Sequence, residues 1–255
     1  MRLLETAAVA FSMFSAIPMP QLSWDDRNMR YALCAFPLVG AVIGGGCWGW
    51  SLLCGALRLP ALLRGAGLCL LPVLLTGGIH LDGCCDTWDA LASHAPARRK
   101  QEILKDPHLG AFAAIRLCCY FLLTFALWAS LPRFPAAPVL LGFCLSRSLS
   151  GLAIAVFPLA KDTGLAHMFA AAADRRRVSA ALALLSAGLC AGLCACGLGG
   201  GAMAAAALLA FLRYRIVAVR QFGGVSGDLA GWFLQTAELW MLIALFTVEI
   251  WEGML

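Results

Sequence analysis

The sequence predicts an all-α fold: a polytopic helical bundle embedded in a membrane, with residues 1–255 forming a single integral membrane domain. Three observations predict it. Hydrophobic residues make up 62% of the chain and charged residues 13%, and the mean hydropathy of +0.84 is far above that of soluble domains. The apolar residues form windows of about 20, the length that crosses a bilayer as a helix. Lys and Arg are concentrated in the loops between the windows.

Seven windows are predicted to span the membrane. Glycine and proline inside them are compatible with helices in lipid, because neighbouring groups satisfy the freed backbone. Met1–Ala16 ends at IPMP and is too short to span, so we expect it to lie at the interface or to enter partway. The seven windows are Phe36–Leu57, Leu62–Ile79, Leu109–Leu131, Ala136–Leu159, Val178–Gly197, Leu198–Val217 and Leu229–Trp251.

The loops between these windows differ in basic residues, eleven on one side and three on the other. Because cytoplasmic loops are enriched in Lys and Arg, the first side is predicted to be cytoplasmic. The N-terminus then lies inside and, with seven spans, the C-terminus outside. The eleven are Arg27, Arg30, Arg98, Arg99, Lys100, Lys105, Lys161, Arg175, Arg176, Arg177 and Arg220, and the three are Arg58, Arg64 and Arg133.

The aspartates, which were not used for this assignment, fall on the same side. We therefore expect one polar site on the cytoplasmic face. The aspartates at or beside the cytoplasmic ends of the windows are Asp82, Asp86, Asp89, Asp106, Asp162, Asp174 and Asp228.

The remaining composition excludes several classes of function. A net charge of +5 fits anchoring at a cytoplasmic membrane face and requires no nucleic-acid partner. The twelve cysteines show no zinc-like spacing and are predicted to be small apolar residues. Cys84 and Cys85 lie inside an aspartate cluster, where the flanking carboxylates favour a hard cation over a soft metal.

The stretch TGGIHLDGCCDTWDAL, Thr76 to Leu91, concentrates the acidic residues. Asp82, Asp86 and Asp89 are spaced i, i+4, i+7, which brings them onto one stripe of a helix. Three adjacent carboxylates repel one another unless a cation lies among them, and oxygen ligands favour Mg²⁺, Mn²⁺ or Ca²⁺. Ordinary surface acids at a helix end are the alternative, but charges at a membrane boundary are costly and favour a function.

His80 lies two residues before the first aspartate and on a regular helix faces away from the stripe. It is a candidate general base, a candidate hydrogen-bond donor to phosphate, or an interfacial histidine. Arg98 to Phe112 adds basic residues beside the carboxylates, which together are the parts that phosphoryl transfer requires. Arg116 and Arg147 lie inside apolar windows, so each must face a cavity or pair with a carboxylate.

Several stretches together resemble the cobalamin synthases, the adenosylcobinamide-GDP ribazoletransferases of cobalamin biosynthesis. The resemblance covers nearly the whole chain, and its most specific part is the core G-G-x-H-x-D-G-x-x-D-T-x-D followed by K-D-x-x-x-G. The stretches are FSMFSAIPMP, FPLVGAVIG, TGGIHLDGCCDTWDAL, EILKDPHLGAF, SRSLSGLAIAVFPLAKDTGLAHMF and GGVSGDLAGWFLQTAELW.

The resemblance implies a multi-pass protein of the prokaryotic cytoplasmic membrane with its active site facing the cytoplasm. It implies an Mg²⁺-dependent enzyme that joins α-ribazole or its 5′-phosphate to adenosylcobinamide-GDP and releases GMP. The partners are then these substrates and the lipid bilayer, while association of protomers with one another or with other corrinoid-assembly enzymes stays open.

Carried onto this sequence, the resemblance implies a role for ten residues. Asp82, Asp86 and Asp89 look like metal and pyrophosphate ligands, with His80 beside them as a catalytic candidate. Asp228 looks like a carboxylate that either faces the substrate or binds a second metal ion. The predicted substrate contacts are Lys105, Asp106, Arg147, Lys161 and Gly224.

The chain departs from the family pattern at three places. Ala90 stands where a glycine is usual, Asp106-Pro107-His108 replaces D-S-R, and WFLQTAE displaces an acidic residue near the last glycine-aspartate. The change from Arg to His at position 108 removes a fixed charge. The aspartate core is intact, which preserves the implied reaction type.

Two other functions are weaker alternatives. A CDP-alcohol phosphotransferase also uses aspartates and Mg²⁺, but its hallmark D-G-x-x-A-R is absent after Asp82-Gly83. A cation-coupled transporter would carry acids mid-span in two related halves. Only Glu238 fits that pattern, and the sequence has no evident internal repeat.

Overall fold

The structure is a computed structural model that describes residues 2–20 and 26–254. Met1 of the expected interfacial segment and the side chain of Arg27 lie outside the described part. Within it the elements are helical, apart from one isolated bridge between Leu159 and Val225. In chain order the helices are α1 (Arg2–Phe14), α2 (Asp26–Met29), α3 (Ala32–Ala56), α4 (Ala61–Thr76), α5 (Ile79–Ala92), α6 (Ala97–Ile103), α7 (Ala111–Ser130), α8 (Ala136–Val156), α9 (Leu165–Ala172), α10 (Arg175–Ala195), α11 (Leu198–Phe222) and α12 (Gly227–Glu252).

The described residues contain six helices long and apolar enough to cross a membrane: α3, α7, α8, α10, α11 and α12. As a pair, α4 and α5 meet the same criteria of length and apolarity, with a bend of 95° at their junction, which makes up to seven crossings. The expected polytopic helical bundle is therefore confirmed. The predicted second span, Leu62–Ile79, extends beyond the end of the observed helix. The helix α4 ends at Thr76, and the chain turns before it continues as α5.

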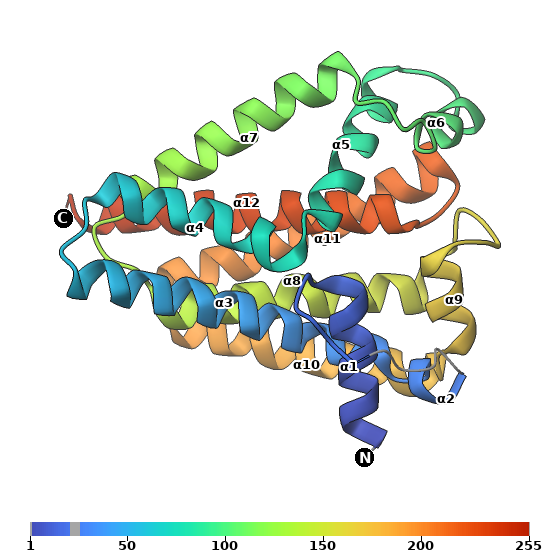
Figure 1. Cartoon of the computed structure of the whole chain (residues 1–255), viewed down its shortest axis with the longest axis horizontal. Coiled ribbons are helices and arrows are strands. Elements are labelled where there is room, and N and C mark those ends of the chain that lie inside the picture. The colour runs from blue at the N-terminus through green and yellow to red at the C-terminus, as the bar shows by residue number, and fades with distance from the viewer. Residues whose placement is uncertain (1, 21–25, 255) are drawn as a thin grey trace.

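Two glycines cause this break. Gly77 and Gly78 have φ angles of 64° and 77°, in the left-handed region that only glycine adopts without strain. Their backbone N–H groups donate to Leu74 and Val73 and so close the last turn of α4. The chain can then leave the direction of α4 and start α5 across the bundle (Figure 1).

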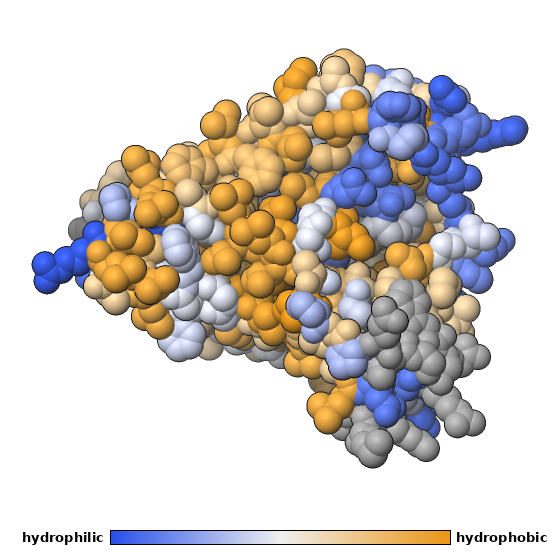
Figure 2. Space-filling view, viewed as in Figure 1, coloured by the Kyte–Doolittle hydropathy of each residue, from blue (hydrophilic) through white to orange (hydrophobic). Residues whose placement is uncertain are grey.

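We define the basic end of the bundle as the end that holds α2, α6, α9 and the loops before α10 and α12. The C-terminus lies at the other end (Figure 1). Figure 2 shows hydrophobic side chains over the middle of the molecule and hydrophilic ones gathered near α6. Large apolar side chains are exposed along the bundle, as expected of a surface that faces lipid. They include Leu52, Leu74, Leu122, Leu184 and Leu209.

The short first helix is packed into the protein. Val9, Ala10 and Met13 of α1 are buried, and the ring of Phe14 lies 4.2 Å from that of Phe36 on α3. At 13 residues α1 is too short to cross a bilayer, in agreement with the sequence analysis. Its contacts give it a structural role at the basic end.

A buried ion pair connects two of the crossing helices. Arg147 of α8 is 1% exposed, forms a salt bridge with Glu238 of α12 and donates a hydrogen bond to Ser146 at 2.8 Å. The expectation that an arginine within a span pairs with a carboxylate or faces a cavity is thus confirmed for Arg147. The carboxylate of Glu238 has a cationic partner and needs no coupling ion.

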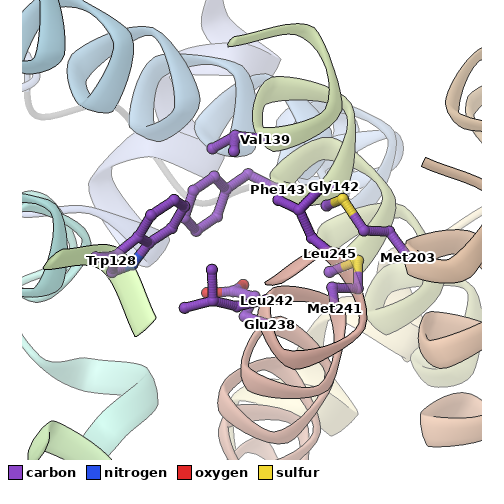
Figure 3. A pocket seen from close by; sticks show the side chains of 9 residues that line it. All are labelled: Trp128, Val139, Gly142, Phe143, Met203, Glu238, Met241, Leu242 and Leu245. Atoms are coloured by element: carbon purple, nitrogen blue, oxygen red, sulfur yellow. The ribbon is translucent and has the colours of Figure 1, made fainter. Parts of the chain in front are cut away.

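The Ser146 hydroxyl also donates to the Glu238 carboxylate at 3.0 Å, and the side chains that line the pocket next to it are apolar. Figure 3 shows the carboxylate beside a small pocket, with the Trp128 and Phe143 rings on one side and the Met203 and Met241 thioethers on another. The pocket holds about 30 Å³, little more than the space of one water molecule. An unpaired charge here would have almost nothing to solvate it.

We predict that Arg147→Met destabilises the protein by about 3 kcal/mol or more, because it leaves Glu238 buried without its partner. Thermal unfolding in detergent would measure the loss. The double variant Arg147→Met, Glu238→Leu removes both charges and should recover most of the stability. Equal destabilisation in the single and the double variant would show that the pair does not act as a unit.

Candidate functional site

The site is organised by a close crossing of α5 and α12. A Cβ atom on Gly83 would lie 2.6 Å from the Cα of Asp228, and one on Gly231 would lie 2.5 Å from the carbonyl oxygen of His80. Because real Cβ atoms do not tolerate such distances, only glycine permits the two helices to approach this closely. The crossing brings Asp82 and Asp228, which are 146 residues apart (228 − 82), to the same place.

Asp82 and Asp228 line one cavity of about 130 Å³, which we call the acidic cavity. Its other walls come from α1, α3, α8 and α9 and are mainly apolar. Asp86 lies close enough to Asp82, Asp228 and Asp89 for their charges to repel one another. The residues of the acidic cavity are Met13, Phe14, Phe36, Ile79, His80, Asp82, Gly83, Ser150, Ile154, Leu165, Ala166, Phe169, Gly227, Asp228, Ala230 and Leu234.

His80 also lines the acidic cavity. The residue is 6% exposed and its ring lies beside the Phe14 and Phe36 pair, at centroid distances of 6.3 and 5.7 Å. Its Nε2 atom is buried and has no hydrogen-bond partner among the described residues. His80 and Asp82 both line the acidic cavity, which borders the first turn of α5.

Asp89 has a different environment from Asp82. Its carboxylate accepts hydrogen bonds from the backbone N–H groups of Gly110 at 2.6 Å and Ala113 at 2.9 Å, at the start of α7. Negative charge at a helix N-terminus satisfies free donors and interacts favourably with the helix dipole. Asp89 thus attaches α7 to α5, and it is not among the residues that line the acidic cavity.

Lys105 and Asp106 lie in the exposed connection between α6 and α7, outside the lining of the acidic cavity. The ring Nδ1 of His108 lies 2.7 Å from the Asp106 carboxylate, and the His108 backbone N–H donates to the same oxygen at 3.0 Å. These two interactions hold the pKa of Asp106 below its usual range. His108, where the family pattern has an arginine, is therefore the local partner of Asp106.

Lys161 and Gly224 lie in two loops that pair at the basic end. Val225 donates to Pro158 at 2.8 Å and Ala160 donates to Val225 at 2.9 Å. A Cβ on Gly224 would collide with the backbone of Leu159, so this contact requires glycine. The pairing brings Lys161 near enough to Asp228 to stabilise its negative charge.

Arg147 does not line the acidic cavity, since it is ion-paired with Glu238 inside the bundle. The structure therefore groups the predicted residues in two sets. Asp82, Asp228 and His80 border one cavity, with Asp86 and Lys161 close by, whereas Lys105, Asp106 and Arg147 lie elsewhere. Whether the second set acts on substrate stays a prediction.

The carboxylates suit only one kind of metal site. Among the described residues, no group of three His, Cys, Asp or Glu side chains could hold a metal ion. This arrangement does not fit Ca²⁺, which takes six to eight oxygen ligands, largely from protein. It fits Mg²⁺, which typically uses one or two carboxylates and completes its shell with water and substrate phosphate. Asp82 and Asp228, which line the same cavity, are the two carboxylates that could supply such ligands.

Sequence reasoning missed two parts of this region. It did not find the apolar walls from α1 and α9, because nothing in those segments marks them as adjacent to α5. It also passed over Arg213, a charge inside the predicted sixth span, where such a residue is itself a signal of function. The side chain of Arg213 lines a second, larger cavity.

The fold and the site together define a class: a polytopic helical membrane protein with a carboxylate-lined cavity between a broken span and its neighbour. Comparison with known proteins identifies the family. The family model of cobalamin-5-phosphate synthase matches residues 6–246, and the chain belongs to this family of cobalamin biosynthesis.

Similar proteins carry a consistent name. Adenosylcobinamide-GDP ribazoletransferase of Lachnoclostridium phytofermentans is 42% identical, over 98% of this chain and 96% of its own length. Those of Geobacillus kaustophilus and Desulfitobacterium hafniense are each 33% identical, over 92% and 93% of this chain and 93% and 95% of their own lengths. No solved structure matches the chain.

We predict that Gly83→Ala lowers stability by about 1–3 kcal/mol, because the added methyl group forces α5 and α12 apart. Thermal unfolding in detergent would measure the change. The matched control is Gly45→Ala on α3, where a Cβ would meet no atom within 4 Å. An equal fall in both variants would mean that the crossing tolerates a side chain.

Proposed function

We propose that this protein is an adenosylcobinamide-GDP ribazoletransferase. It joins α-ribazole or α-ribazole 5′-phosphate to adenosylcobinamide-GDP, releases GMP and forms adenosylcobalamin or its 5′-phosphate. Membership of the cobalamin-5-phosphate synthase family and the names of the relatives support this proposal. The observation that carries the chemistry is the meeting of Asp82 and Asp228, from two distant helices, at one cavity.

The reaction replaces a phosphoanhydride bond with a phosphate ester bond. The ribose hydroxyl oxygen forms a bond to the phosphorus nearest cobinamide, the bond from that phosphorus to the bridging oxygen breaks, and GMP leaves with the bridging oxygen. When bound at these carboxylates, Mg²⁺ supplies positive charge that offsets the charge developing on the phosphate oxygens. Asp82 and Asp228 would provide the oxygen ligands in this proposal, and Asp86 adds negative charge beside them.

The chain's own side chains have two further roles. The proton acceptor for the ribose hydroxyl is His80, whose Nε2 atom has no hydrogen-bond partner among the described residues. Lys161, which lies near Asp228, contributes positive charge for a phosphate oxygen. The apolar walls from α1, α3 and α9 exclude water from the reacting phosphorus and strengthen these electrostatic interactions.

The proposal includes a location: the prokaryotic cytoplasmic membrane, with the acidic cavity open toward the cytoplasm. The excess of Lys and Arg at the basic end supports this orientation. No observation favours either alternative function. Family membership argues against a CDP-alcohol phosphotransferase, and Glu238, the intramembrane acid of the transporter hypothesis, is paired with Arg147.

The deciding assay uses the purified protein in nanodiscs with adenosylcobinamide-GDP plus α-ribazole or α-ribazole 5′-phosphate, and follows the corrinoid product by chromatography. Asp82→Asn and Asp228→Asn should each lower kcat by about 100-fold or more, since each removes a ligand of the charge-stabilising centre. Asp174→Asn, a carboxylate paired with Arg30 at the surface, is the control. A folded preparation that forms no product with either acceptor would refute the proposed function.

Removal of divalent cations should abolish the reaction, and Mg²⁺ should restore it. Asp86→Asn should raise the Mg²⁺ concentration for half-maximal activity, because it removes one negative charge from the cluster. Titration of activity against free Mg²⁺ measures both effects. Full activity in excess EDTA, or an unchanged Mg²⁺ dependence in Asp86→Asn, would contradict the metal role.

The orientation has its own test. Alkaline phosphatase fused after Leu255 should be active, because this enzyme folds only outside the cytoplasm, whereas fusion in the loop at Ala95 should be inactive. Colony staining with a phosphatase substrate provides the measurement, and green fluorescent protein at the same sites should give the opposite pattern. Reversed patterns would place the acidic cavity on the other side of the membrane.

A further inference from the structure

A second cavity lies between α7 and α11 and has walls from α5, α6 and α12. It holds about 550 Å³, against about 130 Å³ for the acidic cavity, and the two share no lining residue. Figure 1 shows α7 and α12 diverging toward the basic end. We call it the arginine groove, after Arg116 of α7 and Arg213 of α11.

The charges of the arginine groove are all positive. Arg116, Arg213 and Lys100 line it, and no Asp or Glu is among its described lining residues. Arg116 and Arg213 are close enough to repel each other. Both belong to membrane-crossing helices, where a charge is costly unless it has a partner. Both arginines are exposed and no carboxylate lines the groove, which favours an anionic ligand.

Arg213 has the most available donors of the three cations. Lys100 donates to Gln221, and Arg116 donates to the backbone carbonyl of Trp88 at 3.1 Å. Arg213 makes no hydrogen bond and no ion pair with the described residues. Its guanidinium instead lies over the rings of Trp232 and Trp240, at 4.8 and 5.5 Å, which hold it in place by cation–π interactions.

The remaining walls indicate what accompanies the anion. Trp88, Trp232, Trp240 and Tyr120 present aromatic surface, and the Tyr120 hydroxyl donates to Gln235 at 2.6 Å. Arginine guanidinium groups match phosphate oxygens in a bidentate geometry. A volume of about 550 Å³ lies within the range of small-ligand sites, about 300–1,000 Å³. The groove therefore suits a phosphate with an apolar or aromatic remainder.

We propose that the arginine groove binds a phosphate ester, with Arg213 and Arg116 on the phosphate and the tryptophans against the rest of the ligand. Two sources carry this chemistry: a soluble nucleotide that enters at the basic end, and the anionic headgroup of a phospholipid that enters from the bilayer. The inference does not depend on the proposed transferase reaction, because binding is measured without turnover.

The experiment has one arm for each source. In the first, the protein in phosphatidylcholine nanodiscs is titrated with radiolabelled GMP in buffer without divalent cations, so that the carboxylates of the acidic cavity repel the probe. In the second, the protein is taken from nanodiscs containing phosphatidylglycerol, and native mass spectrometry measures the lipid that it retains. Binding in the first arm assigns a nucleotide site, and retention in the second assigns a lipid site.

Arg213→Gln should weaken binding by about tenfold or more in the arm that gives a signal, because it removes a charge-assisted contact to phosphate. The matched control is Arg215→Gln on the same helix, whose exposed side chain does not line the groove and lies over Phe157 at 5.7 Å. This control should bind as the unmodified protein does. Arg116→Gln is the second test if Arg213→Gln does not fold.

Two results would overturn the proposal. One is the absence of binding of both GMP and phosphatidylglycerol to the folded, unmodified protein. The other is unchanged binding in a folded Arg213→Gln or Arg116→Gln variant. Transferase activity measured on the same preparations keeps this outcome separate from failure of the proposed function.

Discussion

The close crossing of α5 and α12 is the constraint on which the acidic cavity depends. Gly83 and Gly231 remove the side chains that would keep the helices apart, and Asp82 and Asp228 then face one cavity. The break at Gly77 and Gly78 makes the crossing possible, because α5 can only meet α12 at this angle after the chain has left the direction of α4. Four glycines in two stretches therefore determine where the carboxylates lie.

The charged groups inside the bundle have three different environments: an ion pair, the backbone donors at a helix start, and a cavity. Arg147 and Glu238 neutralise each other next to apolar side chains, which leaves that region without net charge. Asp89 is held by the backbone donors at the start of α7 and fixes the position of that helix. The carboxylates of the acidic cavity have no ion pair within 4 Å among the described residues; Asp228 has the Ser226 hydroxyl at 3.4 Å and the nearby charge of Lys161. Carboxylates without an ion-pair partner, beside a lysine, suit a site for a cation and a phosphorylated substrate.

The two cavities have opposite charge and share no lining residue. The acidic cavity presents carboxylates among apolar walls, and the arginine groove presents guanidinium groups among tryptophans. Both use α5 and α12, so a change in the angle of that crossing would alter both. A bilayer offers little dielectric screening to either set of charges, which explains why each requires a counter-charge from a ligand, an ion or another side chain.

The sequence by itself determined the class of fold and the position of the aspartates at one end, because hydropathy and residue spacing are local properties of a helix. It also carried the family resemblance, which the comparisons confirmed. Only the tertiary structure decided which charges meet. Asp89 binds the start of α7, Arg147 pairs with Glu238, and His80 borders the same cavity as Asp82. A helical period shows which residues share a face of one helix, but contact between helices depends on where their axes cross and on the glycines that permit it.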